Sequence, residues 1–174
     1  MESKTKLLGH PAHQIVVSFP MGLLTTAALF DAVYVVHGGQ MWAMVAFYMI
    51  GAGVVGGLIA AIFGLIDYVA IPSGTRAKRI GGFHGLCSVT LVTLFGVSWL
   101  LRQGAPATPE PRALLFSFTG VVLLGLAGWL GGELLNRMGV GIDDGAHLNA
   151  PSSLNGPAAL GVPLRGPESA HLDH

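Results

Sequence analysis

Four long apolar stretches dominate this 174-residue chain and limit what it can fold into. A helix needs roughly 20 apolar residues to cross the hydrocarbon core of a bilayer. The stretches have about that length or more, and they lack the alternation of apolar and polar residues that indicates a strand. We therefore expect an all-α, integral membrane four-helix bundle, with spans at residues 13–36, 41–71, 82–101 and 113–135.

The composition excludes several other classes of protein. Only 10% of the residues are charged, 52% are hydrophobic, and the mean hydropathy is +0.64, whereas soluble domains carry roughly a quarter charged residues. The formal net charge is +0, so no basic excess indicates a nucleic-acid partner. The expected partner is the lipid bilayer, and a membrane protein partner or a second copy of the chain stays open.

Short connections predict antiparallel neighbouring spans. The reversal at residues 37–40 is the shortest, and Pro, Gly and Ser punctuate the other two. We expect an N-terminal cytoplasmic segment at residues 1–12, a four-span domain at 13–138 and an irregular tail rich in Pro, Gly and Ser at 139–174. A cleaved signal peptide is the alternative for the N-terminus, but the first span is too long for one and is followed at once by another span.

The distribution of basic residues predicts the orientation. With four spans, the N-terminus, the second connection and the tail share one side of the membrane. Seven of the nine basic residues belong to that side, and Arg102 and Arg112 belong to the other. This asymmetry predicts a bacterial inner membrane protein with both termini in the cytoplasm. The seven are Lys4, Lys6, Arg76, Lys78, Arg79, Arg137 and Arg165.

Ionisable residues within the spans predict a polar layer. His13 and His84 lie near the starts of the first and third spans, and Asp67 and Glu133 lie near the ends of the second and fourth. Because alternate spans run in opposite directions, all four should lie at one depth near the cytoplasmic boundary, with His10 beside them. Such residues are costly in a membrane and usually face the interior of a bundle.

The two hairpins also resemble each other in sequence. Each begins with a histidine and ends with an acid, and the segments GGLIAAIFGLIDY and LGLAGWLGGEL are both glycine-rich before the acid. This suggests a weak duplication of one hairpin. In the structural alternatives, Glu133 pairs with Arg137 as an i,i+4 ion pair, and Asp67 pairs with Arg76 or Arg79. The histidines would then be interfacial or capping residues.

Two further features concern packing and the outer ends of the spans. Asp31 lies toward the outer end of the first span, where we expect it to snorkel to the interface or to cap the short turn. Small residues at four-residue spacing in the second span predict close approach of another helix. These helix-packing residues are Gly53, Gly57, Ala61 and Gly64.

Three segments resemble a known family. They are HPAHQIVVSFPMGLL, GLIAAIFGLID and GWLGGELLNRMGVGI, which are similar to the bacterial four-helix membrane family catalogued as domain of unknown function 2231. The resemblance covers roughly residues 10–142 and leaves the tail outside. The positions that match the family pattern are His10, His13, Asp67, His84 and Glu133.

The resemblance implies an integral membrane protein with no assigned reaction. Some members of the family look to be fused to iron–sulfur or cytochrome c domains, which implies a place near electron transfer. This chain departs from the family pattern at three positions, where the family often has His, Asn and His. These positions are Ser18, Ser88 and Met138.

We weigh three functions. In the first, the chain is a non-enzymatic redox-associated or accessory subunit in which His13 and His84 are axial ligands of haem b, and Gly57 and Ala61 make room for the porphyrin. The second is a small transporter for metal ions or protons, and the third is a purely structural assembly subunit. We expect no catalytic residues, because no nucleophile elbow, phosphate loop or zinc-protease motif occurs in the chain.

Overall fold

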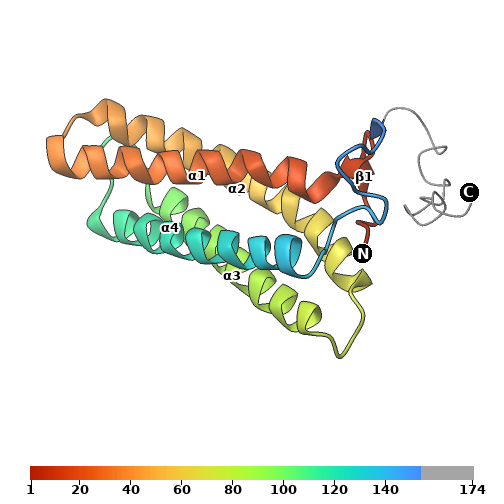
Figure 1. Ribbon diagram of the computed structural model, residues 1–174. Helices are drawn as coiled ribbons and strands as arrows, with labels where there is room; N and C mark the ends of the chain where they lie inside the picture. Colours follow the sequence, from red (N-terminus) through yellow and green to blue (C-terminus); the bar gives the residue numbers. More distant parts are fainter. Residues whose placement is uncertain (154–174) are drawn as a thin grey trace, which may run out of the picture.

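The computed structural model describes residues 1–153 and contains four long helices (Figure 1). All four are long and apolar enough to cross a membrane. This confirms the predicted all-α membrane bundle. The helices are α1 (Ala12–His37), α2 (Gln40–Ala70), α3 (Arg76–Leu101) and α4 (Pro111–Gly132), and α4 continues into the π-helix η1 (Glu133–Arg137).

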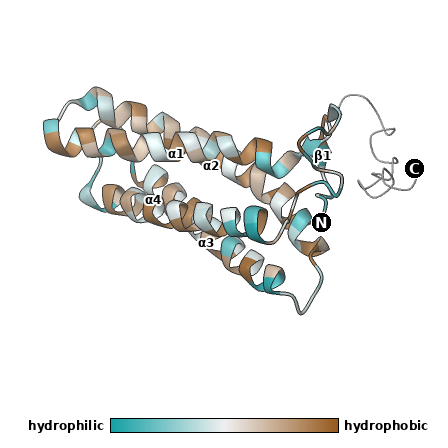
Figure 2. Ribbon diagram, in the orientation of Figure 1, coloured by the Kyte–Doolittle hydropathy of each residue, from teal (hydrophilic) through white to brown (hydrophobic). Residues whose placement is uncertain are grey.

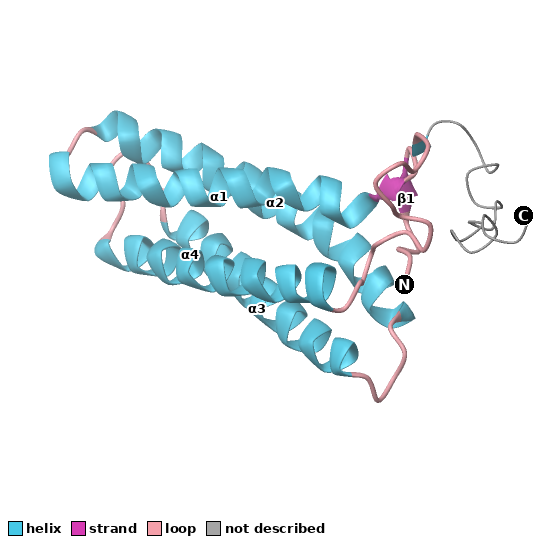
Figure 3. Cartoon of the chain, in the orientation of Figure 1, coloured by secondary structure: helices cyan, strands magenta, loops and turns pink. Residues whose placement is uncertain are grey.

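The helices form two hairpins, α1/α2 and α3/α4, joined by short connections (Figures 1 and 3). Each hairpin packs most extensively within itself, α2 also packs against α3, and α1 contacts α4 less. We call the end that holds the N-terminal segment, the α2–α3 connection and the chain after η1 the terminal end. The opposite end, with the α1–α2 and α3–α4 connections, is the loop end.

Helix α3 begins at Arg76 rather than at residue 82, where the apolar stretch starts. Thr75 caps this helix, because its Oγ1 accepts a hydrogen bond from the backbone N–H of Lys78 at 3.1 Å. With this cap, the helix begins more than one turn before the apolar stretch, in a polar segment of the sequence. Hydropathy identifies the membrane-embedded part of a helix, so it does not detect such an extension.

A two-stranded hairpin precedes α1. Strand β1 (Lys6–Leu7) pairs antiparallel with β2 (His10–Pro11). Leu8 and Gly9 form the turn with φ angles of 51° and 82°, a left-handed conformation that suits two-residue hairpins. We did not predict this hairpin, because only Gly9 indicates it in the sequence.

The chain after η1 folds back on the N-terminal segment. The backbone N–H of Gly141 donates to the carbonyl of Met1 at 2.9 Å, and Lys6 Nζ lies 2.7 Å from an Asp143 carboxylate oxygen. We call residues 1–7 together with 139–144 the clasp. Residues 139–153 contain turns and no long helix or strand, as expected for the tail, and the rest of the predicted tail lies outside the described residues.

The clasp should loosen at acidic pH. The hydrogen bond from Lys6 holds the pKa of the Glu2 carboxyl below its ordinary value of 4.5. A carboxyl with a lowered pKa stabilises the fold above its unfolded pKa, and this contribution is lost as the pH falls through the folded value. We expect the amide of Asp144, which donates to Glu2 Oε1 at 3.3 Å, to lose protection below about pH 4.5. Hydrogen exchange corrected for the intrinsic rate measures this, and the acid-induced change should be absent in Glu2→Gln.

The core lies where the two hairpins meet, and many large apolar side chains elsewhere on the helices are exposed. Hydrophobic residues recur along all four helices (Figure 2). This arrangement is expected of a bundle surrounded by lipid rather than by water. The buried core residues are Leu24, Ala27, Ala46, Ile50, Leu91, Phe95, Leu124 and Ala127.

The face of α2 that meets α1 differs from the predicted stripe. Its small residues are Gly53, Gly56, Ala60 and Gly64. Gly57 faces α3 instead, because a Cβ there would lie 3.0 Å from Val92, and Ala61 is exposed. A stripe repeated every four residues drifts around a helix that has 3.6 residues per turn. Gly57 therefore lies between α2 and α3 whereas Ala61 is exposed, and space for a porphyrin at these two residues stays a prediction.

Candidate functional site

The imidazole of His13 lies against the backbone of α2. Its Nδ1 is 2.9 Å from the carbonyl oxygen of Ala60. A carbonyl only accepts hydrogen bonds, so Nδ1 carries the hydrogen and Nε2 of the neutral ring keeps its lone pair. Gly64 lies one turn further along, where a Cβ would be 2.9 Å from His13 Cε1. The glycine therefore allows the ring to reach the carbonyl.

His84 makes the same contact with α4. Its Nδ1 is 2.9 Å from the carbonyl oxygen of Ala127, and a Cβ at Gly131 would lie 3.4 Å from its Cε1. Each hairpin thus pairs a histidine with an Ala-x-x-x-Gly segment of its second helix. From the sequence we predicted Gly64 only as a helix-packing residue, and Gly131 only as part of the glycine-rich segment before Glu133. The matching contacts agree with a hairpin duplication, which stays a prediction.

The two histidines also lie beside each other. Their ring centroids are 6.3 Å apart and their planes are nearly perpendicular, at 89°. Both rings are half-buried. Because His13 belongs to one hairpin and His84 to the other, this contact bridges the two hairpins. Among residues 1–153, no hydrogen bond or ion pair joins either histidine to an acid.

Asp67 binds the N-terminal segment. Ser3 Oγ donates to both carboxylate oxygens, at 2.9 and 2.8 Å, and the backbone N–H of Lys4 donates to Oδ1 at 2.8 Å. The alternative in which Asp67 pairs with Arg76 or Arg79 is therefore wrong. The sequence pattern did not indicate that the segment before the first span folds back onto the end of the second.

Glu133 and His10 also have partners outside the histidine pair. Glu133 lies 3.4 Å from Arg76 Nη2 at the start of α3, and no ion pair with Arg137 forms among the described residues. His10 is exposed in β2, with its Nε2 3.3 Å from Ser153 Oγ. Of the five residues expected in the polar layer, the structure brings only the two spanning histidines into contact.

A buried ion pair lies at the loop end. Nη1 and Nη2 of Arg102 each donate to one oxygen of the Asp31 carboxylate at 2.7 Å, and both side chains are 0% exposed. Ser117 Oγ donates to the same carboxylate, and Arg102 Nε donates to Ser98 Oγ at 3.3 Å. The expectation that Asp31 snorkels or caps the turn is therefore wrong. From the sequence we placed Arg102 only among the basic residues on the side opposite the termini and did not predict that it pairs with Asp31.

The remaining candidate ligands do not form a larger cluster. Ser18 and Ser88, which depart from the family pattern, donate to the carbonyls of Ile15 and His84 within their own helices. In residues 1–153, no three or more His, Cys, Asp or Glu side chains gather in a group that could hold a metal ion. The chemistry available at this site is therefore that of two imidazole side chains.

The family model described as a predicted membrane protein, DUF2231, matches residues 9–144. The chain belongs to this family. The region matched to DUF2231 contains all four helices, both histidines of the pair and the buried ion pair. No curated protein and no solved structure matches the chain significantly. The family therefore identifies a membrane protein and leaves its function to be inferred from the site.

Proposed function

We propose that this DUF2231 protein is a non-enzymatic, redox-associated membrane subunit in which His13 and His84 are the two axial ligands of a b-type haem. The observation that carries the proposal is the contact of two imidazoles from different hairpins, with ring centroids 6.3 Å apart. In each ring, Nδ1 is held by a backbone carbonyl, which leaves Nε2 as the ligand atom. Such an outer hydrogen bond is usual for histidines that bind metals.

The 6.3 Å separation of the ring centroids is close to that of two imidazoles bound to one metal atom. Two imidazoles on opposite sides of an ion have ring centres roughly 6–6.5 Å apart, given metal–nitrogen bonds of about 2.0–2.1 Å. Haem needs only two protein ligands, because the porphyrin supplies the other four, and it would provide one-electron transfer. A bare zinc ion usually takes three or four protein ligands. The two-histidine site therefore favours haem over a free divalent metal ion.

The transport alternative has less support from the geometry. It needs carboxylates that can exchange protons or metal ions with the histidines. Asp67 instead accepts three hydrogen bonds from the N-terminal segment, and Glu133 lies beside Arg76. In the structural alternative, the two histidines only hold the helices in register through their backbone hydrogen bonds. The experiment below separates that alternative from haem binding.

We also propose an inner-membrane location with the terminal end of the bundle in the cytoplasm. Among residues 1–153, the support is the six-to-two distribution of Lys and Arg between the terminal end and the loop end. Within this orientation, the histidine pair lies toward the cytoplasmic side of the bundle, where a soluble or membrane-bound redox partner could approach it. A second copy of the chain is the other candidate partner.

The test is the visible spectrum and the haem content of the purified full chain, expressed with ample haem supply. We expect a Soret band in the wild type, and a loss of haem affinity of roughly 10- to 100-fold or more in His13→Ala and His84→Ala. The matched control is His37→Ala, because His37 is an exposed histidine at the loop end of α1.

The outcomes separate the alternatives. If the wild type shows no Soret band, or if His37→Ala loses haem as strongly as the two site variants, the haem proposal is overturned. A lowered yield of folded His13→Ala and His84→Ala, with no haem in any sample, would instead support the structural role. Metal analysis of the same samples detects a bound divalent ion and thus tests the transport alternative.

A further inference from the structure

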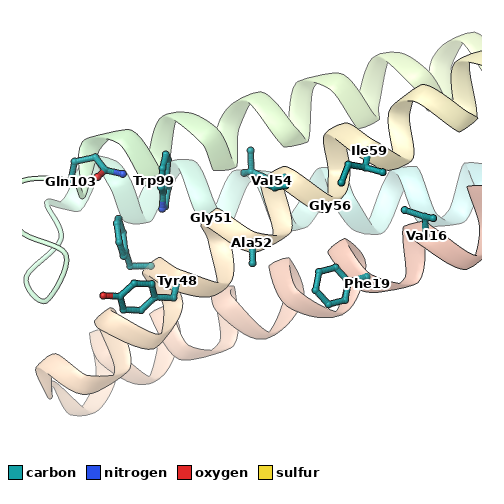
Figure 4. Close-up of a pocket in the computed structure, with 12 residues that line it drawn as sticks. Val16, Phe19, Tyr48, Gly51, Ala52, Val54, Gly56, Ile59, Trp99 and Gln103 are labelled. Atoms are coloured by element: carbon teal, nitrogen blue, oxygen red, sulfur yellow. The ribbon is translucent and has the colours of Figure 1, made fainter.

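Helices α1, α2 and α3 border an apolar groove of about 830 Å³ (Figure 4). Small residues of α2, Gly51, Ala52 and Gly56, form its floor, and Val16 and Phe19 of α1 lie along one side. No charged residue is among the 12 that line the groove. Its volume is in the range of about 300–1,000 Å³ that is typical of ligand sites.

Polar groups gather at one end of this groove. Trp99, Gln103 and Tyr48 lie together toward the loop end, whereas Val16 and Ile59 lie at the other end (Figure 4). Trp99 stacks on Phe47 with ring centroids 5.7 Å apart. Among residues 1–153, no hydrogen-bond acceptor is found for the indole N–H of Trp99, the side-chain amide of Gln103 or the hydroxyl of Tyr48.

We propose that the groove binds one acyl chain of a phospholipid from the leaflet at the loop end. The ester carbonyl of this lipid accepts hydrogen bonds from the Trp99 indole N–H and the Gln103 amide. The bundle spans the bilayer, so lipid is the medium that lies against the groove. Phospholipids carry their ester carbonyls at the interfacial end of the chains, the same end at which the groove carries its donors, and Trp and Tyr are enriched at that depth in membrane proteins.

Several features of the groove indicate that its occupant is an acyl chain rather than a charged ligand. Its walls are uncharged and apolar, so a headgroup phosphate would remain outside it, in water. Trp99 packs against Gly51 and Phe19 packs against Gly56, so aromatic rings border the groove and can make dispersion contacts with an acyl chain. This inference does not depend on haem binding, because the groove and the histidine pair consist of different residues.

The test is native mass spectrometry of the full chain after extensive washing in detergent, followed by identification of the retained lipid. Ala52→Phe fills the groove from an exposed position on α2. The matched control is Ala61→Phe, which makes the same change at an exposed position of the same helix outside the groove. We expect the wild type and Ala61→Phe to retain one phospholipid, and Ala52→Phe to retain roughly tenfold less.

A second variant keeps the test informative if Ala52→Phe folds poorly. Trp99→Phe preserves an aromatic ring against Phe47 and removes the N–H donor, so retention should fall roughly fivefold, as expected for one hydrogen bond. The proposal is overturned if the wild type retains no lipid, or if both groove variants retain as much as Ala61→Phe. Recovery of an isoprenoid quinone, or of a dimer that excludes lipid, would also overturn it.

Discussion

Arg102→Met should destabilise the bundle by about 3–5 kcal/mol, because it leaves a buried carboxylate without its counter-charge. Asp31 is 0% exposed, and after the substitution only Ser117 still donates to it. The ion pair connects α1 of one hairpin to Arg102, which directly follows α3 of the other, so its loss weakens the contact between hairpins directly. Unfolding of the purified protein in mixed micelles with increasing denaturing detergent measures the change.

Two further variants separate loss of the ion pair from a general effect of removing arginine. Arg112→Met removes an arginine that is 81% exposed, with Nη2 3.9 Å from Glu110, and should change stability by less than about 1 kcal/mol. The double variant Asp31→Leu/Arg102→Met removes both buried charges and should recover most of the loss. If Arg102→Met unfolds like Arg112→Met, the ion pair does not hold the hairpins together.

Gly53→Leu should separate α1 from α2. A Cβ at this position would lie 2.5 Å from Leu24 Cδ2 and 2.7 Å from its Cγ, and Leu24 is only 1% exposed, so it cannot move aside. Overpacking of this kind costs about 1–3 kcal/mol or more. Thermal unfolding of the purified protein in detergent should show a clear decrease in the midpoint.

The matched control for this substitution is Gly125→Leu. Gly125 is an exposed glycine in α4, and a Cβ there would have no atom within 4 Å. The midpoint should stay unchanged or rise, because leucine favours a helix by up to about 1 kcal/mol over glycine. Equal midpoints for the two leucine variants would show that α1 does not pack on α2 at Gly53.

The sequence predicts the membrane spans well, because the cost of placing polar residues in lipid is a property of each helix alone. The start of α3 was predicted too late, since Thr75 caps a polar turn that hydropathy does not detect. The position of Asp67 at the terminal end was predicted, but its partner Ser3 was not. The partner depends on how the N-terminal segment folds back, and no periodicity in the chain encodes that path.

The contacts between helices were harder to predict for the same reason. The order of spans places His13 and His84 at a similar depth, but the rotation of each helix decides whether two residues at one depth meet. The same rotation brings Asp31 and Arg102 together although they are 71 positions apart in the chain. The sequence contains the Ala-x-x-x-Gly segments of α2 and α4 that the histidines contact. The same spacing also occurs in ordinary helix packing, so it does not identify these contacts.

The most direct test of the proposed haem site is electron paramagnetic resonance of the oxidised, purified full chain after expression with ample haem. Two imidazole ligands, His13 and His84, should hold the ferric iron in the low-spin state. We expect a low-spin signal in the wild type that is lost in each single alanine variant of the pair. A high-spin signal in the wild type, or no haem signal at all, would contradict the proposal that the two histidines bind one haem between the hairpins.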